Sequence, residues 1–172
     1  DDAGAATGTS VETMFTWTVN NPGPTAGDDS DSTDEDSAIS RNAANGVIDP
    51  NDTDTAPDDD TLEVDQVDGD GANVTNAVTG SNGGEFTIDA DGSYQFDPNN
   101  DFEDLAVGES EQTQVSYRVT DNEGGTNTAT LTVTVNGEND APTTTGLSNQ
   151  TSDDGASVSV ATAGAFSDVD DT

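Results

Sequence analysis

The 172-residue sequence contains no cysteine and no histidine, and its basic side chains are limited to Arg41 and Arg118. The missing residue types exclude disulfide bridges, Cys/His zinc sites and any mechanism that requires a thiolate or an imidazole. With 37 acids against two bases, the formal net charge is −35, which argues against nucleic acid or an anionic membrane as a partner. No apolar run approaches the roughly 18 residues of a membrane span, so we expect no membrane insertion. No signal-peptide pattern occurs, and neither end resembles a natural terminus, so we expect a piece of a longer chain.

Hydrophobic residues are also scarce, at 28% of the chain, and aromatic residues make up 5%. Such values lie near those of disordered proteins. The apolar residues nevertheless form short runs in which apolar and polar positions alternate, and glycines and Asp-Gly pairs separate these runs at turn-like intervals. This pattern favours a folded chain of short β-strands.

The alternating runs predict about seven strands within about 115 residues, which is typical of an all-β, Ig-like sandwich with Greek-key connections. Residues 85–90 and 93–98 flank Asp91-Gly92, a pair that favours a two-residue hairpin turn. Residues 101–109 are interpreted as one short helical turn, because Phe102 and Leu105 are three positions apart. Further strands are predicted at residues 37–42, 61–67, 114–120 and 126–136.

The chain divides into three predicted parts. Residues 1–24 hold the last strand of a preceding domain, at 11–20, and a linker. Residues 25–140 form one complete sandwich, and residues 141–172 supply a linker and the first strands of a following domain. The linkers "NNPGPTAGDD" and "NGENDAPTTTG" are alike in kind, which suggests a tandem array.

The acidic residues cluster where loops are expected. Strands of a sandwich alternate in direction, so alternate loops meet at the same end. One end should therefore gather the first group, Asp28, Asp29, Asp58, Asp60 and Asp121. The opposite end should gather the second group, Glu35, Asn139 and Asp140, with Asp168 and Asp170 reaching back from the next domain.

Several carboxylates that converge within a few ångströms repel one another and raise one another's pKa, a cost that a bound cation removes. Ca²⁺ fits best, because it takes six to eight oxygen ligands from carboxylates, amides and carbonyls. Neither an EF-hand loop nor a complete glycine-rich calcium nonapeptide occurs, so these sites would be assembled from separate loops. Two alternatives remain: each acidic group is a solvated turn, or the whole surface is adapted to salt.

Four segments, "AGDDSDSTDEDSAIS", "DDDTLEVDQV", "DADGSYQFDPNNDFEDLAVGE" and "VSYRVTDNEGGTNTATLTVTVNGENDAP", resemble in order the cadherin-like (VCBS-type) repeats of giant bacterial RTX adhesins. The resemblance covers about residues 25–142. "FTWTVNNPGP" looks like the end of a dystroglycan-type cadherin-like domain and "FSDVDDT" like the early part of another. The resemblance implies a cadherin-like sandwich with Ca²⁺ between domains.

The resemblance also implies the ligands. Calcium below the domain would be held by Glu35, Glu109, Asn139 and Asp140, completed by Asp168 and Asp170. Calcium above it would be held by Asp58, Asp60 and Asp121. The stretch "NDTDTAPDDDTL" is longer than the family's usual "NDTDPDGDTL", which leaves the ligands between Asp52 and Asp60 open.

The sequence therefore predicts a calcium-rigidified structural extender of a secreted, cell-surface bacterial adhesin, exported by type I secretion. Its partners would be the neighbouring domains, and other copies could complete the partial end domains by strand exchange. One alternative is a binding module in which loop 49–60 or 68–84 contacts sugar or protein. Another is an accessory domain of an extracellular enzyme. A catalytic role for the chain itself is not expected, because no aromatic cleft accompanies the carboxylates.

Overall fold

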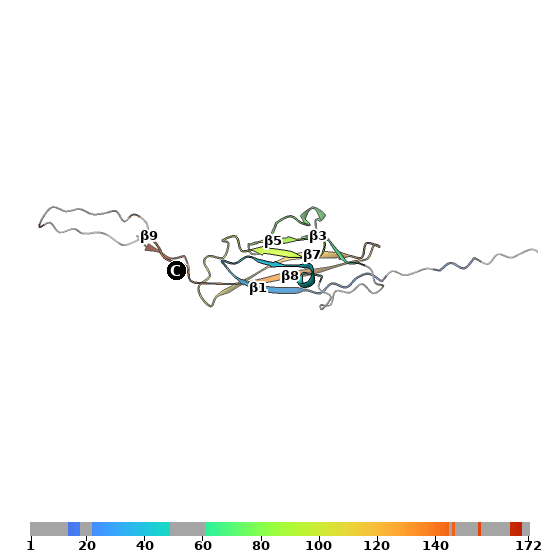
Figure 1. Ribbon diagram of the computed structural model, residues 1–172, viewed down its shortest axis with the longest axis horizontal. Helices are drawn as coiled ribbons and strands as arrows, with labels where there is room; N and C mark the ends of the chain where they lie inside the picture. The colour runs from blue at the N-terminus through green and yellow to red at the C-terminus, as the bar shows by residue number, and fades with distance from the viewer. Residues whose placement is uncertain are drawn as a thin grey trace, which may run out of the picture.

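The computed structural model describes residues 14–17, 22–48, 61–144, 146, 155 and 166–169. Two four-stranded sheets pack face to face as a β-sandwich, as predicted (Figure 1). The first sheet has the order β1 (Asp29–Asp34), β8 (Thr126–Asn136), β7 (Ser110–Thr120) and β3 (Glu63–Val67). The second has the order β2 (Ile39–Arg41), β6 (Tyr94–Asp97), β5 (Glu85–Ile88) and β4 (Val78–Thr79).

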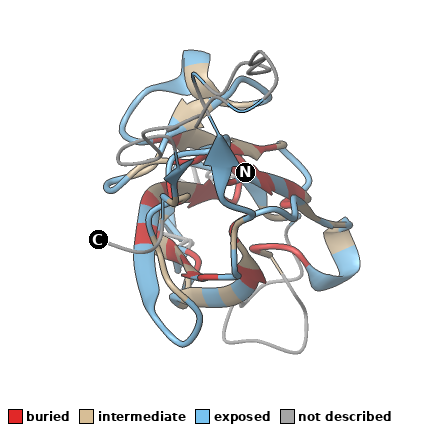
Figure 2. Cartoon of the chain, turned by 90° about the vertical axis from the view of Figure 1, so that its left-hand side faces the viewer, coloured by how far each residue is buried: buried red, intermediate tan, exposed pale blue. Residues whose placement is uncertain are grey.

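The core follows from the alternation of residues along the strands. In β8, Ala129, Leu131, Val133 and Val135 are buried while the threonines between them are half-buried or exposed. Burial of one strand face at every second residue fixes the register, because a slip by one position would turn the apolar set outward. Figure 2 shows the buried residues lying between the two layers. The predicted core residues of β5, β6 and β7 are likewise buried: Phe86, Ile88, Tyr94, Phe96, Val115, Tyr117 and Val119.

Two local predictions are corrected. The pair Asp91-Gly92 does not form a two-residue turn: of the two, Gly92 alone has a positive φ, of 83°, and the loop extends from Asp89 to Ser93. A left-handed glycine after a type I turn is the usual form of such longer hairpin loops. Residues 101–109 form no helix but a series of turns, in which the Leu105 amide donates to the Phe102 carbonyl at 3.0 Å.

Two strands were not predicted, β4 and the acidic strand β1. β1 pairs in parallel with β8, from Asp29 opposite Leu131 to Asp34 opposite Asn136. The other pairings in the two sheets are antiparallel. Because β1 and β8 run together, the chain enters the sandwich at one end and leaves it at the other. We call these the N-terminal end and the C-terminal end.

Short pieces outside the sandwich complete the described chain. Residues 14–17, from the predicted strand 11–20, have no regular secondary structure, and Trp17 is 88% exposed; the rest of that segment lies outside the described residues. Beyond the C-terminal end, β9 (Thr143–Thr144) pairs antiparallel with β10 (Phe166–Ser167). Two short 3₁₀ turns, η1 (Ala43–Asn45) and η2 (Gly71–Asn73), lie in loops.

Candidate functional site

Four carboxylates gather at the C-terminal end: Glu35, Asp36, Glu103 and Asp140, which we call the acidic end cluster. Glu35 is 4% exposed, and its Oε1 accepts a hydrogen bond from the Glu138 amide at 2.8 Å. Its Oε2 is closed to solvent and has no hydrogen-bond partner within the described part of the chain, as is also true of Asp34 Oδ1. A buried carboxylate oxygen without a donor is costly, which makes Glu35 a group that gains from a cation.

The charges of the acidic end cluster act on one another. Burial raises the pKa of Glu35, the hydrogen bond from Glu138 acts against this rise, and the negative charges of Asp140, Glu103 and Asp36 raise it further. Burial together with Asp140 and Asp36 also raises the pKa of Glu103. A raised carboxyl pKa means that the folded state disfavours the charged form, so the cluster destabilises the metal-free fold at neutral pH.

Glu109 and Asn139 lie beside this cluster, but their side chains are used locally. The Glu109 carbonyl accepts from the Gly137 amide at 3.1 Å, which brings its backbone next to Glu138. Its carboxylate accepts from the Ala106 amide at 3.2 Å. The side-chain amide of Asn139 (Nδ2) donates to the Asp140 backbone carbonyl at 2.6 Å. A metal would therefore have to draw these two side chains away from their present partners.

The pairing of β9 with β10 returns the chain to the linker. Ser167 lies opposite Thr143, and its carbonyl accepts from the Thr143 hydroxyl at 3.2 Å. Asp168 follows directly after β10, which ends at Ser167. One carboxylate oxygen of Asp140 and one of Asp168 are closed to solvent. Asp170 lies outside the described residues.

At the N-terminal end, Asp121 is buried beneath the linker. Its Oδ1 accepts from the amides of Glu123 and Gly125 at 2.9 and 2.8 Å, which closes a tight turn. A Cβ on Gly125 would lie 2.1 Å from Asp121 Oδ2 and 2.6 Å from Gly23 Cα, so a side chain at position 125 does not fit. Asp58 and Asp60, the predicted companions of Asp121, lie outside the described residues.

Asp28 and Asp29 are not brought to Asp121. Asp28 accepts from the Thr130 amide at 2.9 Å, and Asp29 accepts from the Tyr117 hydroxyl at 2.6 Å. Asp28 hydrogen-bonds to Thr130, and Asp29 lies opposite Leu131 in the β1–β8 pairing. These two residues lie four and five positions beyond Thr126, where β8 begins, which is roughly 13–17 Å along the strand. Both acids line a cleft of about 320 Å³ on the side of the sandwich.

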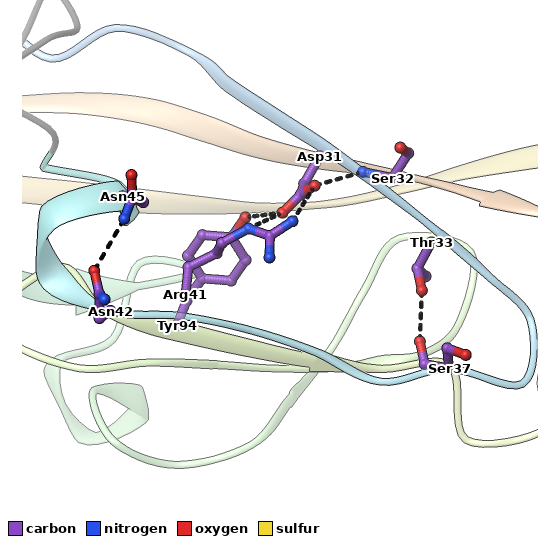
Figure 3. Close-up of polar contacts among 8 residues, drawn as sticks. All are labelled: Asp31, Ser32, Thr33, Ser37, Arg41, Asn42, Asn45 and Tyr94. Atoms are coloured by element: carbon purple, nitrogen blue, oxygen red, sulfur yellow. Dashed lines mark hydrogen bonds and ion pairs between the residues drawn. The ribbon is translucent and has the colours of Figure 1, made fainter.

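The same cleft contains a polar contact that joins the edges of the two sheets (Figure 3). Asp31 of β1 accepts from Arg41 Nε and Nη2 of β2 at 2.7 and 2.8 Å, and from the Tyr94 hydroxyl of β6 at 2.7 Å. Burial raises the pKa of Asp31, but the hydrogen bonds from Arg41, Tyr94 and Ser32, with the Arg41 charge, outweigh it and leave the pKa lowered. This carboxylate is already neutralised by protein groups.

The arrangement can hold a cation but is not preassembled. Among the described residues, no three acidic side chains stand close enough to form a ready metal site. The donor set at the C-terminal end nevertheless fits Ca²⁺, which accepts carboxylate, amide and carbonyl oxygens in flexible geometry. The feature that best fits a calcium ion is the buried Glu35 Oε2, which lies near the charges of three further carboxylates.

Sequence reasoning missed Glu103 in this set and left Asp36 out of the predicted ligands. The sequence places Glu103 in a predicted helical turn. The feature that could have indicated its position is the neighbouring Phe102, which is 1% exposed and packs into the core. Burial of Phe102 fixes the backbone at position 103 beside the cluster.

Comparison with known protein families matches residues 21–137 to the bacterial cadherin-like domain. A search of curated proteins found no match to this chain. Within the described residues, no helix has both the length and the apolar character needed to cross a membrane. The matched region spans most of the chain and contains both four-stranded sheets, so this protein belongs to the bacterial cadherin-like domain family.

Proposed function

We propose that this chain is a calcium-rigidified structural extender of a secreted bacterial surface adhesin. Family membership indicates a structural or adhesion-type extracellular module, and no enzymatic family is indicated. The adhesin context, the partial neighbours of dystroglycan type and export by type I secretion are proposed from the sequence resemblance. The role of the calcium is proposed from the chemistry of the C-terminal end.

One observation carries the calcium proposal: the buried Glu35 carboxylate, with one oxygen lacking a donor, among the charges of Asp36, Glu103 and Asp140. A chain with two cations has almost no protein charge to offset this repulsion, and both cations are paired elsewhere, with Asp31 and Asp65. A divalent cation would convert the repulsion into attraction.

The acidic end cluster would hold the ion, with Asn139 from the linker and Asp168 and Asp170 from the chain that follows. When bound, Ca²⁺ would supply positive charge and a link between oxygens of separate loops. Glu35 would anchor the site, because Glu138 fixes one of its oxygens. Asp140 would couple the linker to the sandwich and Asp168 would couple the following domain to the linker. A second site at the N-terminal end, with Asp58, Asp60 and Asp121, is proposed on the resemblance.

The consequence is a joint that stiffens with calcium. A charged linker with proline and glycine bends freely without metal. Extracellular-type sites have Kd values on the order of 10⁻⁴–10⁻³ M, so they fill outside a cell and stay empty in the cytosol. At one hundred times Kd, each site stabilises the folded state by about 2.7 kcal/mol. The chain would then be pliable during export and fold fully outside.

Calorimetric titration of the chelated full chain with Ca²⁺ tests the proposal. We expect saturable binding with Kd on the order of 10⁻⁴–10⁻³ M and a rise in Tm. Glu35→Gln and Asp140→Asn should each weaken binding and remove most of the rise in Tm. The matched control is Glu85→Gln, an exposed carboxylate on β5, which should leave both unchanged.

Two further conditions sharpen the experiment. A control melt in NaCl at the ionic strength of the calcium buffer measures how much of the rise in Tm comes from charge screening alone. A salt-adapted surface would respond to both salts, whereas a calcium site responds only to calcium. X-ray scattering with and without calcium measures the joint. A chelated chain with the same maximum dimension and the same Tm as the calcium-loaded chain would refute the proposal.

A further inference from the structure

A second cleft lies midway along the sandwich, away from the acidic end cluster. Its volume is about 230 Å³, and Val115 of β7 is among its lining residues, although its side chain is buried in the core. The lining residues come from the middle of β7, from β8, from Thr79 of β4 and from the loops on either side of β4. The polar lining residues are Asp68, Thr79, Ser81, Gln114, Ser116 and Thr130.

Both rims of this cleft are tied to β7 through the backbone. On one rim, the Asp68 amide donates to the Ser116 carbonyl at 2.8 Å. On the other rim, the Ser81 amide donates to the Gln114 carbonyl at 3.0 Å, and Ser81 Oγ accepts from the Gln114 amide at 3.2 Å. The two rims are therefore attached two residues apart on β7, at Gln114 and Ser116, and this spacing sets the width of the opening.

The loop between the two rims is held by its own polar groups. Asp68 and Gly69 have φ values of 49° and 78°, and Val67 and Asp70 exchange two hydrogen bonds of 3.1 Å, which together define a two-residue turn. Asn73 Nδ2 donates to the Val67 carbonyl at 3.0 Å. The Thr75 amide donates to the Ile88 carbonyl of β5 at 2.9 Å. In Figure 1 this loop follows β3 and rises above the sheets in green. The cleft is preorganised, which lowers the entropic cost of binding.

Apart from the Ser81 hydroxyl, the side-chain polar groups in this cleft are unused, in contrast to those in the larger cleft around Asp31. Within the described residues, no hydrogen bond engages the hydroxyls of Thr79, Ser116 and Thr130, the side-chain amide of Gln114 or the carboxylate of Asp68. In the larger cleft, Asp28, Asp29 and Asp31 all accept from protein donors. The smaller cleft thus presents free hydrogen-bond donors and acceptors to a ligand.

The lining selects a neutral polyhydroxylated ligand. Hydroxyl and amide groups both donate and accept, as do sugar hydroxyls, and a carboxylate is a strong acceptor for hydroxyl pairs. One carboxylate with no cation repels anions and offers too few ligands for a metal. Drug-sized ligands occupy about 300–1,000 Å³, so about 230 Å³ suits a smaller group such as one sugar ring.

We propose that this cleft, lined by Asp68, Ser116 and Thr130 among others, binds a single neutral hexose unit of a glycan. The site lies on the side of the rod that the proposed extender forms, so each domain contacts glycan laterally while its ends hold the joints. Binding is expected in the millimolar range, because the cleft is open and each new hydrogen bond replaces one to water. An array of such domains would gain strength from multivalency.

The test is a ¹⁵N NMR titration of the full chain in calcium buffer with the methyl glycosides of glucose, mannose, galactose and allose. Relative to glucose, the other three each invert one hydroxyl, at C2, C3 or C4, so each ring position is tested in both orientations. Each is added to about 50 mM, which detects Kd values weaker than millimolar. We expect saturable shifts at the amides of Asp68, Ser81, Gln114 and Ser116 with at least one glycoside.

Variants separate the cleft from non-specific contact. Asp68→Asn removes the charge, and asparagine tolerates the positive φ of this turn, so the fold is kept while binding weakens about tenfold. Thr130→Val removes one hydroxyl at constant shape and should also weaken binding. Glu111→Gln, the same charge change at an exposed position of β7, should leave it unchanged. Absence of saturable shifts with all four glycosides, or shifts that Asp68→Asn and Thr130→Val leave intact, would overturn the proposal. Its failure leaves the calcium titration of Glu35→Gln unaffected.

Discussion

Asp31 illustrates what a single carboxylate can do in a chain with two cations. It takes hydrogen bonds from Arg41 and Tyr94, which belong to the other sheet, and from the Ser32 amide at 2.8 Å. The Asp31 side chain is 15% exposed, so its ion pair with Arg41 is screened less than a surface pair. Glu35 is the opposite case, since its neighbours are negative and its burial therefore opposes its charge.

Replacing Asp31 with asparagine should destabilise the fold by about 1.5–3 kcal/mol at pH 7, because hydrogen bonds to a charged group are lost and Arg41 is left unpaired. The folded-state pKa of Asp31 lies below its ordinary value of 3.8. Its contribution is therefore present above pH 3.8 and is lost as the pH falls through the lowered pKa.

Urea unfolding at pH 7 and at pH 3 measures both effects. The difference between wild type and Asp31→Asn should shrink at the lower pH. Asp65→Asn is the control, because the Asp65–Arg118 pair is about one-third exposed on both sides and is expected to contribute less than about 1 kcal/mol. Equal losses for the two variants would contradict the expectation.

At the scale of elements, the loops that the sequence leaves polar are held by specific strand residues. Thr113 of β7 is fully buried, donates to the Gly83 carbonyl at 2.8 Å and accepts from the Asn82 amide at 3.3 Å. Gly80 lies against it so closely that a Cβ there would be 2.2 Å from Thr113 Oγ1. One hydroxyl thus anchors the turn that leads into β5.

Thr113→Val keeps the shape but leaves these two backbone groups without their partner. We expect a loss of about 1–3 kcal/mol in the free energy of unfolding. Thr132→Val on β8, a half-buried position on the outer face of the sheet, should change stability by less than about 0.5 kcal/mol. Chemical denaturation of the two variants in parallel measures both changes in the free energy of unfolding. Similar losses for Thr113→Val and Thr132→Val would show that the Thr113 hydroxyl does not anchor the turn.

The alternation of apolar residues predicted most strands of the sandwich, and β2 was predicted as well, within residues 37–42. β5 to β8 and β3 were predicted because one face of each packs into the core, and β8 was predicted with its observed bounds. β1 was missed, since its aspartates are poor strand formers and find acceptor roles that depend on residues distant in sequence, such as Arg41. The candidate site divides in the same way: Glu35 and Asp140 follow from strand direction, whereas Glu103 requires the folded path of the loop that carries it.

At the scale of the whole molecule, the shortage of cations also limits how a protease can attack. The full sequence offers trypsin two cleavage sites, after Arg41 and Arg118. Both arginines lie within strands and hold carboxylates, Asp31 and Asp65. Cleavage is therefore expected to be faster in opened molecules, and its rate then reports the open population when reclosing is fast.

If calcium stabilises the fold as proposed, tryptic cleavage should slow by about 100-fold at one hundred times Kd relative to chelated protein. Mass spectrometry should find first cuts at Arg41 or Arg118. Trypsin activity in each buffer is normalised with a small arginine ester, since calcium also affects the protease. Equal normalised rates with and without calcium would count against the proposal, and Glu35→Gln should lose the protection.

The parallel pairing of β1 with β8 has a mechanical meaning for a chain pulled from both sides. Tension on the entering segment draws β1 one way along its neighbour, while tension on the departing segment draws β8 the other way. The six paired positions from Asp29 to Asp34 are then loaded together in shear instead of being unzipped one at a time. A domain paired in this manner resists stretching along its length, as the proposed extender would have to.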